Sequence, residues 1–405
     1  MSPSSTSITD SPTSESLHSF YSTSLSATST AISKPDHLWN TQLHNLAASA
    51  PDFERLEGLI RTGVDIGFQN TAGETFLHVL VPKRLGNKLP DLLLSCRDRG
   101  FNFMQRSNSG VTAIHAVLNS ISDMEQGLNL LSILPELQVN LYARDRFNRL
   151  AVDTLRLWRD RITNSGTNFS ATSMYLEQLL QSYASQQRKR LPLVTETPPS
   201  RPKLLETDQG ICKPVEADEA MSRFVERSWF NPQAEDEAGK TRLVCLILMV
   251  RPRFGSHNEC PPSRIDLIKS CLRTEIDVNA YDKAGSTALH HLLSKPLLGS
   301  EEEVKCVLRL LLEAGADVHL RDRTGGTALH LACQSGLPEC TALLIQHITE
   351  SPYCYHHRAP GVNATNDEGR SVVAEAWSLL KRTQSALKRD GIQQCINQVN
   401  EAGGR

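Results

Sequence analysis

Residues 308–332 read "LRLLLEAGADVHLRDRTGGTALHLA", and this stretch decides the fold. Its first part is the end of an amphipathic helix. Ser300 and Glu303, just before the quoted stretch, form a capping box that starts this helix, and Gly315 is suited to terminate it. The apolar residues that recur at helical spacing in this segment are Val304, Val307, Leu308, Leu311 and Leu312. Asp322 is suited to pin a tight turn, and the Thr327 hydroxyl to cap a second, short helix. The unit is therefore a turn, a short helix and a long helix.

The tetrapeptide Thr-Ala-Leu-His within this stretch belongs to an internal repeat. Similar copies begin at Thr41, Thr75, Thr112, Thr287 and Thr327, and weaker copies begin at Leu150, Thr241 and Ser371. A residue that tolerates a positive φ stands two positions earlier, at Gly73, Gly110, Asn148, Gly239, Gly285, Gly325 and Gly369. A short polar residue stands three positions before that, at Asn70, Ser107, Asp145, Asp236, Asp282, Asp322 and Asn366. An internal repeat with a period of tens of residues predicts a repeat solenoid.

The pattern resembles the ankyrin repeat, whose signature is D-x-x-G-x-T-P-L-H-x-A followed by a second helix that ends in L-L-x-x-G-A. The closest copy is "DRTGGTALHLA" at 322–332, preceded by "LLEAGADV". The resemblance implies an all-α ankyrin-repeat solenoid of helix-turn-helix units with projecting β-turn fingers. About seven to eight repeats in two blocks are expected.

Composition changes divide the chain into four segments. Residues 1–36 are rich in Ser and Thr and predict a disordered tail. Residues 37–187 form the expected N-terminal block, and residues 236–400 form the C-terminal block with its cap. Between them the repeat is interrupted, and the proline and charge content of 188–235 favours an exposed linker or insertion. A further degenerate repeat within this segment remains an alternative.

Charge and cysteine usage narrow the function classes. With 43 Lys+Arg against 45 Asp+Glu, the formal charge of −2 gives no overall attraction to nucleic acid or acidic membranes. The apolar run at 243–250 is too short to cross a bilayer. Ten cysteines without a CxxC pair, and no visible export signal, predict reduced thiols and a soluble cytoplasmic or nuclear protein.

Three chemical motifs favour structural roles. Gly239-Lys240-Thr241 resembles a P-loop ending, but Ala234 stands where that loop needs glycine. The repeated histidines recur in register, and in the family this imidazole bonds the backbone between units. Cysteine and histidine also gather at Cys340, His347, Cys354, His356 and His357, without the paired spacing of a zinc site. We therefore expect no catalytic residue, no cofactor and no metal.

The resemblance implies a non-enzymatic scaffold or adaptor that binds an unidentified partner protein through the concave face and turn fingers, as a monomeric array. The alternative is a transcriptional coregulator, since fungal pathway regulators combine ankyrin repeats with a basic DNA-contacting segment, although no such segment is evident at this amino terminus. No direct nucleic-acid or membrane contact is expected. Candidate contact residues at turn and first-helix positions are Thr71, Glu74, Asn108, Arg146, Phe147, Lys283, Ser286, Arg323, Thr324, Gln334, Asp367 and Glu368.

Leu248 and Met249 add a further expectation. They follow Thr241 at positions where a concave-face helix is usually polar, and Val244 replaces the usual histidine in the same helix. A helix that is apolar all round needs cover on both sides. We therefore include Leu248 and Met249 among the candidate contacts, to be covered by the preceding linker or by a partner.

Overall fold

The computed structural model describes residues 36–49, 51–121, 124–137, 139–164, 174, 178, 181–182, 225, 234–249, 263–274, 276–294, 300–350 and 361–404. The predicted tail lies outside these residues except for Asp36, and the predicted linker does so except for Val225, Ala234 and Glu235. Regular structure in the described part is helical, with isolated β-bridges at the turns. The all-α solenoid is confirmed, and the number of repeats stays a prediction.

The helices form two rows. The first block contains α2 (Gln42–Ser49), α3 (Phe53–Arg61), η1 (Pro82–Arg84), η2 (Gly86–Lys88), α4 (Leu89–Asp98), α5 (Ala113–Ser120), α6 (Met124–Ile133) and α7 (Ala151–Asn164). The second block contains α10 (Arg242–Leu248), α11 (Arg264–Leu272), α12 (Ala288–Ser294), α13 (Glu301–Glu313), α14 (Ala328–Ser335), α15 (Pro338–Glu350), η3 (Gly361–Asn363), α16 (Val372–Leu380) and α17 (Ala386–Glu401).

Stacking of like helices builds the second block. The short helices α10, α12, α14 and α16 pack in series, and the long helices α11, α13, α15 and α17 pack in a parallel series. In α13 the side chains predicted to face the core are all buried, and Ser300 caps the helix by accepting the Glu303 N–H. Gly315 follows the helix with a φ of +87°. The apolar face, the Ser300 cap and the Gly315 terminus are therefore confirmed, and of the predicted capping box the structure shows the half in which Ser300 accepts the Glu303 N–H.

One repeat departs from the expected turn, short helix and long helix. Residues 75–80 form only a turn, where a short first helix was expected. Pro82 follows two residues later, and the residue before a proline is sterically driven out of the α region. Val81 accordingly has φ −100° and ψ 89°, and the chain continues into η1 and η2 before α4 begins.

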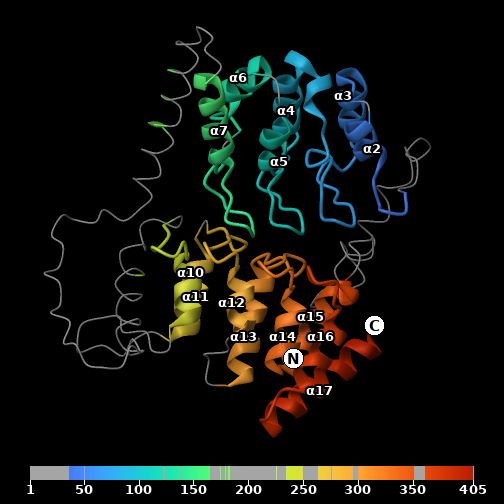
Figure 1. The fold of residues 1–405 in the computed structure, drawn as a ribbon, viewed down its shortest axis with the longest axis vertical. Helices are drawn as coiled ribbons and strands as arrows, with labels where there is room; N and C mark the ends of the chain where they lie inside the picture. Colours follow the sequence, from blue (N-terminus) through green and yellow to red (C-terminus); the bar gives the residue numbers. More distant parts are fainter. Residues whose placement is uncertain are drawn as a thin grey trace, which may run out of the picture.

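Figure 1 shows how the two blocks are arranged. The first block runs from α2 to α7 along the top, the second runs back from α10 to α16 below it, and the turns of both rows point toward each other. Each row has its own hydrophobic core. Buried residues from Leu43 to Leu155 along the sequence form the first core, and buried residues from Val225 to Val399 form the second. The turn fingers therefore lie between two separate cores.

Candidate partner-binding surface

Most turn fingers are locked by an Asp or Asn at the short polar position, whereas the Ser107 hydroxyl bonds the Ser109 hydroxyl instead. Asp322 Oδ1 accepts the Thr324 N–H at 2.8 Å and the Gly326 N–H at 2.9 Å. Asn70, Asp145, Asp236 and Asn366 make the same pair of bonds in their own turns. Gly325 follows with φ +82°, and Asn148 adopts +62° where the other turns carry glycine. The predicted turn chemistry is confirmed, and it holds the finger backbone rigid.

Four of the repeated histidines link neighbouring repeats. His290 Nδ1 accepts the Thr287 N–H at 3.1 Å, so its proton is on Nε2, which lies 3.2 Å from the Leu320 carbonyl of the next repeat. His44, His78 and His330 lie in the same way against Glu74, Val111 and Arg370. Burial lowers the pKa of His115 and His330 to about 4. These imidazoles are neutral structural groups, as their repeat frame predicts.

A second ladder runs through the residue immediately before the short polar residue, which we call the pre-turn position. It is occupied by Gln69, Arg106, Arg144, Glu235, Tyr281, Arg321 and Thr365. Gln69 Nε2 donates to the Arg106 carbonyl at 2.8 Å, and Arg106 Nη1 donates to the Arg144 carbonyl at 2.7 Å. Tyr281 Oη donates to the Arg321 carbonyl at 2.8 Å.

The pre-turn position has no recurring residue type, so the repeat pattern of the sequence does not mark it. What its donors share is a long side chain that ends in an N–H or O–H group. The sequence signal that could have identified them is their constant place before the turn residue. In the structure Tyr281, one of these side chains, is only 1% exposed. The pre-turn position therefore sets the spacing between fingers.

The two rows of fingers also contact each other. Ion pairs join Arg106 to Asp277 at 3.1 Å, Arg144 to Glu235 at 2.8 Å and Arg146 to Asp367 at 3.0 Å. In each pair the arginine belongs to the first block, and Asp277 and Asp367 belong to the second. Glu235 occupies the pre-turn position of the first finger of the second block. The candidate surface is therefore partly engaged within the chain.

Comparison with known proteins agrees with this geometry. The chain is 39% identical over 71 residues to protein phosphatase 1 regulatory subunit 27 of Mus musculus, over 18% of this chain and 42% of that protein. It is 34% identical over 97 residues to the NF-kappa-B inhibitor cactus of Drosophila yakuba, over 24% and 19% of the two chains. A sequence model of ankyrin repeats matches residues 262–355 and 297–376. The chain therefore contains ankyrin repeats.

A third relative has the same partial coverage. The Notch-regulated ankyrin repeat-containing protein of Xenopus tropicalis is 35% identical over 79 residues, over 20% of this chain and 63% of that protein. The matches thus span less than two thirds of each of these three relatives. Ankyrin repeats are protein–protein interaction modules. The array described above shares such a module with these relatives.

The candidate contact residues of the ankyrin array fall into three groups by exposure. The exposed ones are Phe147, Lys283, Arg323, Thr324, Asp367 and Glu368. The half-buried ones are Thr71, Glu74, Arg146, Leu248, Ser286 and Gln334, and the buried ones are Asn108 and Met249. Asn108 lies in the contact between rows, where its carbonyl accepts the Arg321 N–H at 3.1 Å. Met249 lies in the second core, and Val225 of the predicted linker is buried in that core too.

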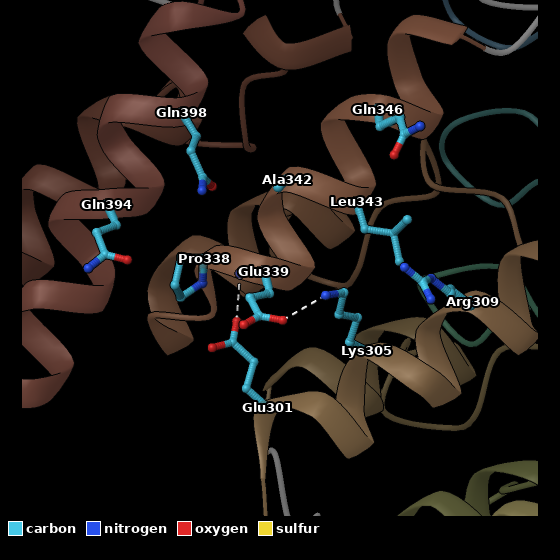
Figure 2. A pocket seen from close by; sticks show the side chains of 10 residues that line it. All are labelled: Glu301, Lys305, Arg309, Pro338, Glu339, Ala342, Leu343, Gln346, Gln394 and Gln398. Carbon is cyan, nitrogen blue, oxygen red and sulfur yellow. Dashed lines mark hydrogen bonds and ion pairs between the residues drawn. The ribbon is translucent and has the colours of Figure 1, made fainter.

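Outside the fingers, a groove of about 580 Å³ lies on the long-helix face of the ankyrin array, lined by α13, α15 and α17. Figure 2 shows Glu301, Glu339 and Lys305 linked at one end of it. Lys305 Nζ lies 2.7 Å from Glu339, and the Glu339 N–H donates to Glu301 at 2.7 Å. These contacts join the start of α15 to α13 at that end of the groove.

The predicted cysteine and histidine cluster is only partly described. Cys340 is fully buried on α15, where burial raises the pKa of its thiol to about 12, and His347 is half-buried on the same helix. Cys354, His356 and His357 lie outside the described residues. In the part of the chain that the structure describes, no three His, Cys, Asp or Glu side chains gather as a metal site would require. Nor does any described helix have the length and apolar character to span a membrane.

Proposed function

We propose that this chain is a non-enzymatic scaffold or adaptor that holds a partner protein on the fingers and concave face of its ankyrin array. The observation that carries the proposal is a set of exposed side chains on locked turns, of which Lys283, Arg323 and Glu368 stand on successive fingers of the second block. Since the backbone beneath them is fixed by Asp282, Asp322 and Asn366, binding orders few additional groups. This pre-organisation favours recognition of a folded partner.

The relatives support a regulatory role. Two of them are named as a phosphatase regulatory subunit and as an NF-kappa-B inhibitor, so each is named for its effect on another protein. By analogy, the present chain acts by contact with a protein whose activity or location it controls. The alternative is a coregulator, in which that protein belongs to a transcriptional pathway. Exclusion of a tagged full-length chain from the nucleus would refute this alternative.

The test is affinity capture with mass spectrometry on full-length protein. The variant Lys283→Ala, Arg323→Ala, Glu368→Ala removes three exposed tips and keeps the aspartate and asparagine that lock the turns. A matched control removes the same three charges from exposed positions on outer helices, Lys269→Ala, Arg389→Ala and Glu401→Ala. We expect partners that the wild type and the control retain and the tip variant loses. Equal retention by all three proteins contradicts the proposed surface.

A further inference from the structure

Three arginines of the first block point into the contact between rows. The side chains of Arg106, Arg144 and Arg146 are only 5%, 10% and 12% exposed, while their carboxylate partners in the three ion pairs remain 35%, 24% and 43% exposed. The buried member of each pair is therefore the cation. A buried cation requires an anionic neighbour, so these arginines need carboxylates whatever supplies them.

The second block fits these arginines closely. The Tyr281 ring lies under the Arg106 guanidinium at 5.5 Å and also against Gly110, where an added Cβ would come within 2.6 Å of the ring. A Cβ on Gly285 would lie 2.2 Å from the Arg146 carbonyl oxygen. Such close backbone approaches indicate a specific docking of one row on the other.

The fit leaves part of the arginine binding capacity unused. Arg144 Nε and Arg146 Nε are both buried, and neither donor has a hydrogen-bond partner among the described residues. On the acidic side, burial raises the pKa of Glu235 even though Arg144 lies beside it. An arginine presents five donors in a planar fork, and a carboxylate approaching along that fork binds two of them. A ligand that carries several carboxylates thus has hydrogen-bond acceptors for the Arg144 and Arg146 Nε donors, which the second block leaves without a partner.

We propose that Arg106, Arg144 and Arg146 form a docking site for an acidic segment of a partner protein, and that carboxylates at the fingers of the second block occupy it in the closed chain. This inference rests on the proposed scaffold function and names the chemistry of the partner. The acidic segment displaces Asp277, Glu235 and Asp367, so its binding separates the two rows. While the two rows remain in contact, which is the closed form of the chain, access to the arginines is limited.

The first experiment uses the unaltered full-length chain. Hydrogen exchange is followed at the Arg321 amide, which the Asn108 carbonyl protects across the rows, with and without a fluorescein-labelled peptide of 15 glutamates and aspartates. We expect saturating acidic peptide to increase exchange at that amide at least tenfold, whereas a neutral glutamine and asparagine peptide of equal length leaves it unchanged. Unchanged exchange at saturating acidic peptide overturns the proposal without any variant.

The second experiment measures peptide affinity by fluorescence anisotropy. Glu235→Gln, Asp277→Asn, Asp367→Asn removes the internal competitor, so binding of the acidic peptide should tighten at least tenfold. The charge-matched control Glu54→Gln, Glu313→Gln, Glu401→Gln alters exposed carboxylates elsewhere and should bind as the wild type does. Equal affinities in these three proteins overturn the proposal. A second comparison uses the triple variant Arg106→Gln, Arg144→Gln, Arg146→Gln, which should bind the acidic peptide more weakly than the control Arg61→Gln, Arg97→Gln, Arg156→Gln. Equal binding by these two variants also overturns the proposal.

The two proposals fail separately. If the acidic peptide shows none of these responses while the Lys283, Arg323 and Glu368 variant still loses a captured partner, the scaffold stands and the arginine site is refuted. If the peptide responses occur and no captured partner depends on the exposed tips, the arginine site stands and the exposed tips are refuted as the binding surface.

Discussion

The Arg146 carbonyl rests directly on Gly285, and this contact gives a sharp test of the packing between rows. Gly285 has φ +80°, and an alanine Cβ there would lie 2.2 Å from the carbonyl oxygen, against an ordinary contact of 3.4 Å. The carbonyl would have to retreat by about 1 Å, because repulsion rises steeply below contact distance. Gly285→Ala therefore disturbs the row contact as well as its own turn.

Gly369 provides a matched control. It has φ +74°, and a Cβ added there meets nothing within 4 Å, so Gly369→Ala introduces backbone strain alone. A left-handed conformation costs an L-residue about 1 to 2 kcal/mol. Gly285→Ala bears the same strain and also loosens the Arg146–Asp367 pair, whose charged hydrogen bond contributes about 1.5 to 3 kcal/mol. The expected losses are then about 1 to 2 kcal/mol for Gly369→Ala and about 2.5 to 5 kcal/mol for Gly285→Ala.

Urea unfolding of both full-length variants, followed by far-UV circular dichroism, measures the difference. The free energy of unfolding should fall by at least about 1.5 kcal/mol more for Gly285→Ala than for Gly369→Ala. Gly110→Ala should resemble Gly285→Ala, since its Cβ would meet the Tyr281 ring at 2.6 Å. Equal losses in the Gly285 and Gly369 variants would show that the Arg146 carbonyl does not rest on this turn, and the reasoning about the contact between rows would fail.

Further predictions concern protonation, thiols and the core. His115 and His330 have folded-state pKa values of about 4 against an ordinary 6.5, so the unfolded chain binds their protons first as pH falls. Each of these two histidines contributes about 3 kcal/mol to the free energy of unfolding, which is complete above pH 6.5 and is lost as pH falls toward 4. Urea midpoints that stay constant over this pH range would contradict this prediction. Burial raises the pKa of the Cys96 and Cys245 thiols to about 12, so mass spectrometry should find them alkylated only after unfolding. Leu311→Ala, which truncates a fully buried side chain, should lower the free energy of unfolding by about 2 to 5 kcal/mol, and a loss below about 1 kcal/mol would contradict its core position.

Local signals in the sequence were sufficient for the turns and for most helices. Asp322, Gly325 and Thr327 act on atoms only a few residues away, so their types and spacing determine the turn geometry directly. The same holds for α13, where Ser300 caps the helix and one apolar face packs inward. The histidine contacts were predictable because one residue type recurs in one frame. These features recur wherever the repeat recurs.

Contacts between the two rows could not be predicted in this way. Arg106 and Asp277 are 171 residues apart, and Arg146 and Asp367 are 221 residues apart. No periodicity links such positions, because the contact depends on how the second block folds back over the first. For the same reason, the turn residues Asn108 and Arg146 looked like free finger positions in the sequence and are engaged within the chain in the structure.

The charge at the pre-turn position nevertheless carries information about this contact. The ladder within a row needs only a neutral donor, since the Gln69 amide and the Tyr281 hydroxyl both serve in it. Arg106 therefore carries a charge that the ladder does not require, and it directs its second guanidinium nitrogen to Asp277. Arg144 donates one guanidinium nitrogen to Asn148 of its own turn and the other to Glu235. One guanidinium nitrogen of Arg106 spaces the fingers of its own row, and the other binds the facing row. An arginine at a position where glutamine or tyrosine suffices is thus the residue-level sign that a finger has a second, acidic neighbour.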